Sequence, residues 1–197
     1  LQEYLAGTRF AGSLVSAAEI VVPLRARKSA TESSFIRAAI RETQEIFAAL
    51  GRHARIGQSE RELFDWTQQE VSRRGLGYAW DQAGNPIVNT GPYSMVGHGV
   101  PSDALRIAPG HILHVDLGVT LNGYSSDLQR CWYVPRGDGN SHQEPPEDVR
   151  RVLRAVTGAI SAAADALRPG VMGWEVDAAA RSYFVGQGYP EYLHATG

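Results

Sequence analysis

Hydrophobic and polar residues alternate along residues 113–119, which read Leu, His, Val, Asp, Leu, Gly, Val. This period of two predicts a β-strand with one buried face and one open face. A second run with strand composition covers residues 124–134, and the Asn-Gly pair at 122–123 is typical of a two-residue hairpin turn. The pattern therefore predicts an antiparallel hairpin in which Leu121 pairs with Tyr124.

The same register places two aspartates on one face of the hairpin. Asp116 faces Gln129 and Gly118 faces Asp127, so the two carboxylates are diagonal neighbours with Cα atoms roughly 7–8 Å apart. Two unpaired carboxylates on an apolar hairpin repel each other, and a cation between them removes that cost. Alternatively, each aspartate caps a turn or pairs with an arginine such as Arg130. Arg130, however, has the opposite parity from Asp127 and is expected to point to the other face.

Helical periodicity marks three further segments. Residues 31–50 carry apolar residues three and four apart and are followed by Gly51, a second helix ends near Gly75, and residues 147–167 are helical again. The polar stretch 136–148 reads as an exposed loop.

Two of the helical segments share a pattern at a constant interval. Glu62 aligns with Glu175 and Gly75 with Gly188, each pair separated by 113 residues. This interval predicts two structurally similar halves, and the alternative is two amphipathic helix pairs that merely share composition. If the repeat is real, we expect the chain to stop before the second set of strands.

Composition narrows the possible functions. The chain has 197 residues, 43% of them hydrophobic, which is enough for one substantial core. A net charge of −2 gives no electrostatic reason to expect nucleic acid or an anionic membrane as partner. The single cysteine, Cys131, cannot form an internal disulfide and fits a reducing compartment. The sequence contains no Walker A, GxSxG, HExxH or CxxC motif.

The hairpin also carries a spaced motif, D-L-G-x(4)-G-Y-x-S-D, from Asp116 to Asp127. Upstream stands GHGVPSDALRIAPG at residues 97–110, and the C-terminus reads HATG. Together these motifs resemble the creatinase/prolidase/methionine aminopeptidase superfamily, closest to its Xaa-Pro-cleaving branch, over roughly residues 24–197. The resemblance implies an α+β pita-bread fold of two pseudo-symmetric αβ halves, the second incomplete in this chain. It also implies that residues 1–23 are a linker or a remnant of an N-terminal domain and that 24–197 are a partial catalytic domain.

Metal-dependent members of that superfamily hold two divalent ions with two aspartates, a histidine and two glutamates. Asp116 and Asp127 match the aspartates, and the other three ligands would follow Gly197. By resemblance, Asp127 bridges both ions and Asp116 binds one. Oxygen-rich ligation with one imidazole favours manganese, with cobalt and zinc as alternatives.

The resemblance also assigns roles to histidines. His98 matches the substrate-side histidine of the family and His194 matches a second family histidine, so we expect both to be catalytic through contacts with the substrate or the developing oxyanion. His114 shares a face with Asp116 and is by parity a candidate ligand. The family position is not normally a ligand, so we expect His114 to line or support the site. The remaining histidines are expected on the solvated surface: His53, His111 and His142.

One position departs from the family. After the second aspartate the family usually reads D-x-T-R-T, whereas this chain reads DLQRC. Gln129 therefore replaces a small hydroxyl side chain on the metal face. We expect this change to alter ion affinity or the ordering of water.

These observations predict a dinuclear-metal-dependent peptidase that acts at Xaa-Pro bonds of short peptides, as aminopeptidase P or prolidase does. A catalytically inactive pita-bread binding module and a metal-free creatinase-like hydrolase are the alternatives. With half of the metal motif present, the chain by itself is expected to be inactive. The expected partners are a short peptide and a second copy in a homodimer, with no nucleic acid and no membrane. The expected location is the cytoplasm.

Overall fold

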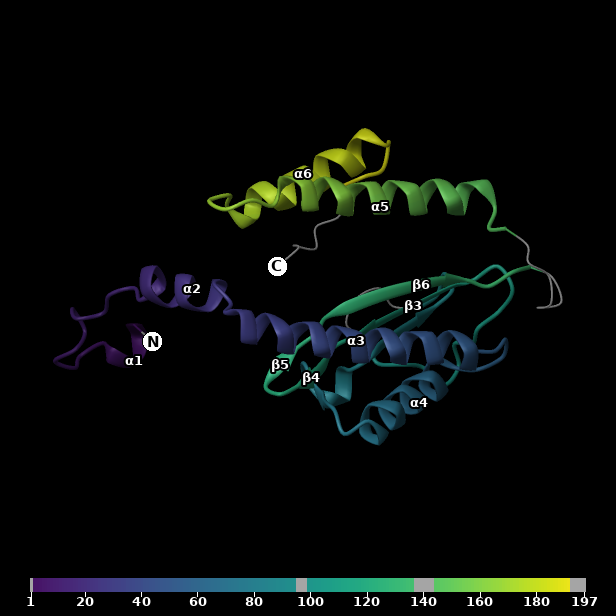
Figure 1. Ribbon diagram of the computed structural model, residues 1–197, viewed down its shortest axis with the longest axis horizontal. Coiled ribbons are helices and arrows are strands. Elements are labelled where there is room, and N and C mark those ends of the chain that lie inside the picture. The colour runs from purple at the N-terminus through teal and green to yellow at the C-terminus, as the bar shows by residue number, and fades with distance from the viewer. Residues whose placement is uncertain (1, 95–98, 137–143, 192–197) are drawn as a thin grey trace. The chain divides into compact units, whose positions relative to one another are not determined.

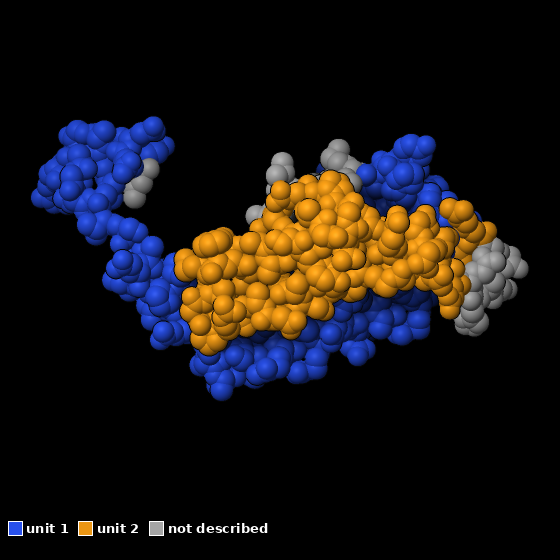
Figure 2. All heavy atoms as spheres, turned by 90° about the horizontal axis from the view of Figure 1, so that it is seen from above, with its two compact units in different colours: residues 1–134 blue, residues 135–197 orange. Residues whose placement is uncertain are grey.

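The computed structural model describes residues 2–94, 99–136 and 144–191. The chain forms two compact units, Leu1–Val134 and Pro135–Gly197, which are coloured separately in Figure 2. In the described parts of the chain, no helix is long and apolar enough to span a bilayer. The domain boundary expected near residue 24 stays a prediction.

In the part of the first unit that the structure describes, four α-helices combine with two small antiparallel sheets (Figure 1). Its helices are α1 (Gln2–Leu5), α2 (Ala18–Ala26), α3 (Ala30–His53) and α4 (Glu60–Arg73), with a 3-10 turn at Gln82–Gly84. One sheet has the order β1-β4-β5, made of Gly77–Tyr78, Val119–Leu121 and Tyr124–Ser125. The other has the order β2-β3-β6, made of Ile87–Thr90, Ile112–Leu117 and Leu128–Tyr133.

The predicted hairpin register is confirmed. Leu121 pairs with Tyr124, and Asp116 pairs with Gln129. Asn122 has a φ of 53° and the next residue has a φ of 77°, the left-handed conformation that a tight hairpin turn requires.

The two faces of the β2-β3-β6 sheet differ as the alternation predicts. Helices α3 and α4 pack on one face, where apolar residues of β3 are buried in the core. The opposite face carries the polar partners of the same strands, including Asn89, His114 and Asp116. The core combines both helices with the covered strand face: Ile46, Phe47, Leu50, Leu63, Phe64, Val71, Leu113, Val115 and Leu117.

The hairpin passes from one sheet to the other at Gly118. A Cβ at this position would collide with the side chains of Trp80 and Ala79, and it would lie 2.7 Å from the backbone oxygen of Ser126. The backbone oxygen of Gly118 also accepts hydrogen bonds from Ala79 N and from Asn85 Nδ2. Only a residue without a side chain fits this crossing.

Replacing Gly118 by alanine is therefore expected to destabilise the protein by about 1–3 kcal/mol, the usual cost of overpacking a filled interior. The measurement is the midpoint of urea unfolding. Gly84→Ala is the matched control, because a methyl group added at Gly84 meets no atom of the described chain within 4 Å. An unchanged midpoint for Gly118→Ala would show that the crossing is not tightly packed.

Over residues 144–191, the second unit forms a helix pair, α5 (Glu147–Ala166) and α6 (Gly173–Gly186). Helices α4 and α6 have 14 residues each, and α6 begins and ends 113 residues after α4. Glu62 accepts a hydrogen bond from Ser59 N, and Glu175 accepts one from Met172 N, so both helices begin in the same way. The predicted likeness of the two helix pairs is confirmed for α4 and α6, while residues 144–191 contain no strand.

Candidate metal centre

Asp116 and Asp127 meet on the open face of the β2-β3-β6 sheet. Asp116 lies in β3, and Asp127 directly precedes β6. The residue before Asp127, Ser126, is buried, and its Oγ lies 2.7 Å from Thr43 Oγ1 of α3 and accepts a hydrogen bond from Val119 N at 3.0 Å. Ser126 is thereby fixed toward the helices, and the following aspartate is left on the opposite face.

The environment of Asp116 disfavours its ionised form. Burial, followed by the nearby negative charge of Asp127, raises the pKa of the Asp116 carboxyl from 3.8 to about 6, and a side-chain hydrogen bond with Asp127, which needs a proton on one of the two carboxyls, acts in the same direction. The charge of His114 and a hydrogen bond from Gln129 act in the opposite direction. Gln129 Nε2 donates to Asp116 Oδ2 at 3.0 Å. Within the described residues, no group donates a hydrogen bond to the buried Oδ1 of Asp116.

A divalent cation fits this arrangement. A buried carboxylate oxygen without a partner is costly, and a second carboxylate beside it adds repulsion that a cation reverses. Hard oxygen donors of this kind suit manganese and similar ions. The described residues contain no group of three or more His, Cys, Asp or Glu side chains placed to hold an ion. The pair Asp116 and Asp127 supplies two carboxylates of the predicted ligand set, and their role as metal ligands stays a prediction.

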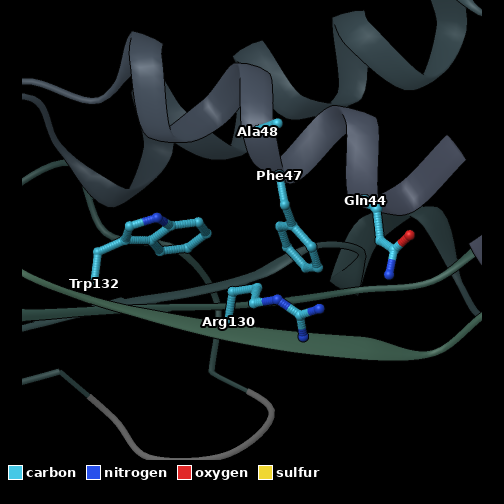
Figure 3. Close-up of a pocket in the computed structure, with 5 residues that line it drawn as sticks. All are labelled: Gln44, Phe47, Ala48, Arg130 and Trp132. Atoms are coloured by element: carbon cyan, nitrogen blue, oxygen red, sulfur yellow. The ribbon is translucent and has the colours of Figure 1, made fainter. Parts of the chain in front are cut away.

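The alternative in which an arginine neutralises the aspartates is wrong for Arg130. Its guanidinium lies 5.6 Å from the ring centroid of Phe47 on α3, on the helix side of the sheet. Figure 3 shows Arg130 and Trp132 on that side, near Phe47. A surface hollow of about 290 Å³ lies there, lined by Gln44, Phe47, Ala48, Arg130 and Trp132. Because it opens on the face opposite the aspartates, this hollow is separate from the candidate metal centre.

His114 lies on the same face as Asp116 and contacts two amide side chains. Its Nε2 lies 3.0 Å from Gln129 Oε1, and its Nδ1 lies 3.1 Å from Asn89 Oδ1. The ring therefore bridges β2 and β6 beside Asp116 and lies in contact with amide side chains. The two predicted catalytic histidines, His98 and His194, lie outside the described residues, so their roles stay predictions.

Two of the histidines expected on the solvated surface are partly exposed and make packing or polar contacts that the sequence did not indicate. His53 stacks on Trp66 with ring centroids 4.3 Å apart, and burial, followed by the charge of Arg55, lowers its pKa. His111 is half-buried beside Thr90, whose Oγ1 lies 3.4 Å from its Nδ1. The third, His142, lies outside the described residues.

Sequence reasoning missed Glu60, a carboxylate that is 2% exposed at the start of α4. Its Oε1 accepts hydrogen bonds from Thr90 N at 2.8 Å and from Ser94 Oγ at 2.6 Å, and its Oε2 accepts one from Ser102 N at 3.1 Å. A signal was available in the run Ser-Glu-Arg-Glu at residues 59–62. Glu62 completes the capping box with Ser59, which leaves the first glutamate free for another role.

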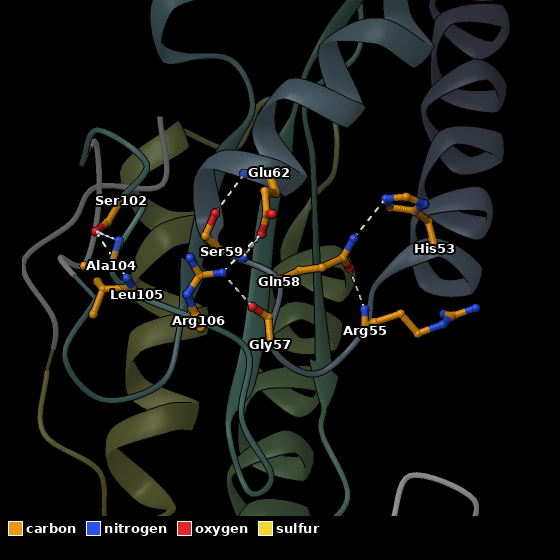
Figure 4. Close-up of polar contacts among 10 residues, drawn as sticks. All are labelled: His53, Arg55, Gly57, Gln58, Ser59, Glu62, Ser102, Ala104, Leu105 and Arg106. Carbon is orange, nitrogen blue, oxygen red and sulfur yellow. Dashed lines mark hydrogen bonds and ion pairs between the residues drawn. The ribbon is translucent and has the colours of Figure 1, made fainter.

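The segment that contains Ser102 is tied to the same helix end. Figure 4 shows Arg106 between Gly57 and Glu62, with its Nη1 donating to Gly57 O at 2.8 Å and lying 3.5 Å from Glu62 Oε2. The Oγ of Ser102 accepts hydrogen bonds from Ala104 N and from the next backbone N–H. The start of α4 therefore holds the chain on both sides of residues 95–98 through Ser94 and Ser102.

Comparison with known proteins gives a consistent result. The model of metallopeptidase family M24 matches residues 34–197. An uncharacterized peptidase of Bacillus subtilis is 30% identical over 185 residues, which are 93% of this chain and 49% of that protein. An Xaa-Pro dipeptidase of Pyrococcus furiosus is 29% identical over 180 residues, or 91% of this chain and 48% of that protein.

Solved structures agree. The crystal structure of an X-Pro aminopeptidase from Thermotoga maritima superposes with a TM-score of 0.74 at 27% identity, covering 87% of this chain and 45% of that one. The predicted pita-bread fold is confirmed by such neighbours. The chain spans about half the length of the curated relatives it matches.

Proposed function

The chain belongs to metallopeptidase family M24, and on that premise we propose that the protein carrying it cleaves Xaa-Pro bonds in short peptides with two divalent metal ions. The observation that carries the proposal is the pair Asp116 and Asp127, with one buried carboxylate oxygen of Asp116 left without a hydrogen bond by the described residues. The names of two similar proteins, an Xaa-Pro dipeptidase and an X-Pro aminopeptidase, support the choice of bond.

In this proposal Asp116 and Asp127 supply the negative oxygens that hold the metal. Bound divalent ions would lower the pKa of a water molecule toward neutrality and polarise the scissile carbonyl. Gln129 keeps one oxygen of Asp116 occupied by a hydrogen bond and leaves the other for the ion. His98 and His194 would stabilise the developing oxyanion or orient the peptide. Manganese is the favoured ion, with cobalt and zinc as alternatives.

The proposal predicts strict dependence on both metal and proline. Protein stripped of metal with a chelator should cleave nothing, and added Mn²⁺ should restore cleavage of an Xaa-Pro dipeptide and of an Xaa-Pro tripeptide. Peptides of the same length with alanine in place of proline should be cleaved far more slowly. The measurement is product release followed by chromatography, with Co²⁺ and Zn²⁺ in parallel.

Two outcomes would contradict the proposal. Cleavage that survives metal removal would favour a metal-free hydrolase of the creatinase kind. Peptide binding without cleavage under any metal would favour an inactive binding module.

A further inference from the structure

The side chain of Gln129 has a defined orientation. A carboxylate oxygen can only accept hydrogen bonds, so the contact of 3.0 Å with Asp116 Oδ2 must involve the amide nitrogen of Gln129. The amide oxygen then points to His114, whose Nε2 lies 3.0 Å away and donates. Gln129 is thus held from both ends, by a carboxylate on one side and by the imidazole on the other.

The contacts continue beyond His114 into the unit's interior. His114 Nδ1 lies 3.1 Å from Asn89 Oδ1, and Asn89 Nδ2 donates to Ser94 Oγ at 3.0 Å. The Ser94 hydroxyl donates to Glu60 Oε1 at 2.6 Å. Glu60 is 2% exposed and also accepts hydrogen bonds from the backbone N–H groups of Thr90 and Ser102, so its carboxylate is held in place.

These contacts form one hydrogen-bonded chain between two carboxylates, here called the Glu60–Asp116 chain. Its members come from α4, the segment after β2, and strands β2, β3 and β6: Glu60, Ser94, Asn89, His114, Gln129 and Asp116. Both ends can only accept hydrogen bonds, which sets the direction of the contacts next to them. Connected polar groups that are partly buried hold each other in position more firmly than isolated pairs do, and every member of this chain except the exposed Gln129 is partly or fully buried.

We propose that Gln129 and His114 are positioning residues for Asp116, which hold Oδ2 in place and present Oδ1 to a divalent cation. This inference rests on the proposed function for the identity of the ligand, while the hydrogen-bonded chain itself does not. Side chains that orient a metal ligand commonly change metal affinity about 10–100-fold when they are removed. The Glu60–Asp116 chain also links the metal face to Ser94, which precedes the segment with the predicted catalytic His98.

The first test uses the protein without metal. In ¹⁵N-glutamine-labelled protein, the side-chain amide resonances of Gln129 should shift when His114 is replaced by phenylalanine and when Asp116 is replaced by asparagine. Gln69→Leu, a change on the exposed surface of α4, should leave these resonances in place. Side-chain amide resonances of Gln129 that stay unchanged in both variants would overturn the proposal.

The second test measures Mn²⁺ affinity by calorimetry in the intact protein that contains these residues. Gln129→Leu should weaken binding about 10–100-fold, whereas the same chemical change at Gln69 should have no effect. His114→Phe should weaken binding too, and the double variant should bind no more weakly than Gln129→Leu alone, because both changes break one chain.

The outcomes distinguish a failure of the positioning role from a failure of the proposed metal-dependent function. Unchanged or tighter binding by Gln129→Leu, or full additivity of the two changes, would overturn the positioning role. A protein that binds no Mn²⁺ but shows the resonance shifts would overturn the proposed function and leave the positioning of Asp116 supported.

Discussion

Replacing Asp127 by asparagine is expected to abolish metal-dependent cleavage of an Xaa-Pro peptide and leave the fold intact. Asparagine has nearly the same shape but carries no charge, so the pair with Asp116 loses half of its negative charge. Metal ions contribute several kcal/mol to transition-state stabilisation, so their loss should lower kcat/KM on the order of 10³-fold or more. Asp127 is exposed, and the substitution removes its repulsion of Asp116, so unfolding should not become easier.

The measurement is kcat/KM at saturating Mn²⁺, with circular dichroism and thermal unfolding to verify the fold. Asp65→Asn is the matched control, because it makes the same chemical change on α4 at an exposed residue whose ion pair with Arg61 is 4.0 Å long. Activity should be unchanged in this control. An Asp127→Asn variant with normal Mn²⁺-dependent activity would remove the basis for the metal centre.

The hairpin could be predicted in detail because its determinants are local. The Asn-Gly turn fixes which residues pair, and strand parity then decides which face each side chain takes. A slip of one residue would have moved Leu113 and its alternating neighbours out of the core, at a large cost in buried apolar surface. The positions of Asp116 on the open face and of Arg130 on the helix side both follow from that rule.

Features that depend on tertiary contacts could not be predicted from the sequence in the same way. Glu60 stands at a helix start, where an acidic residue is ordinarily a solvated neighbour of the helix dipole. Its burial follows from contacts with residues 30 to 42 positions later in the chain. The contacts of His53 and His111 are likewise tertiary, since the ring of His53 stacks on Trp66 and Thr90 Oγ1 lies 3.4 Å from His111 Nδ1. No local sequence pattern predicts that the side chain of Gln129 contacts both Asp116 and His114.

Mn²⁺ affinity is expected to fall steeply when the pH is lowered through about 6. The raised pKa of Asp116 means that its carboxyl takes up a proton in this range, and a metal ligand must be deprotonated. Well below that pKa, one competing proton weakens metal binding about tenfold per pH unit. Calorimetric titrations at a series of pH values from about 4.5 to about 7.5 would measure how Mn²⁺ affinity changes with pH on both sides of the expected transition.

The metal-free protein should show the opposite dependence. The folded protein binds the Asp116 proton more tightly than the unfolded chain does, because the pKa is about 6 in the fold against 3.8 ordinarily. The resulting stabilisation is full below about 3.8 and is lost as the pH rises through 6, so urea unfolding should need less denaturant at pH 7.5 than at pH 5. Asp116→Asn should remove this component, since an amide has no proton to exchange in this range. If wild type and Asp116→Asn lose stability equally between pH 5 and 7.5, another group causes the change, and the pKa of Asp116 is not raised in the folded protein.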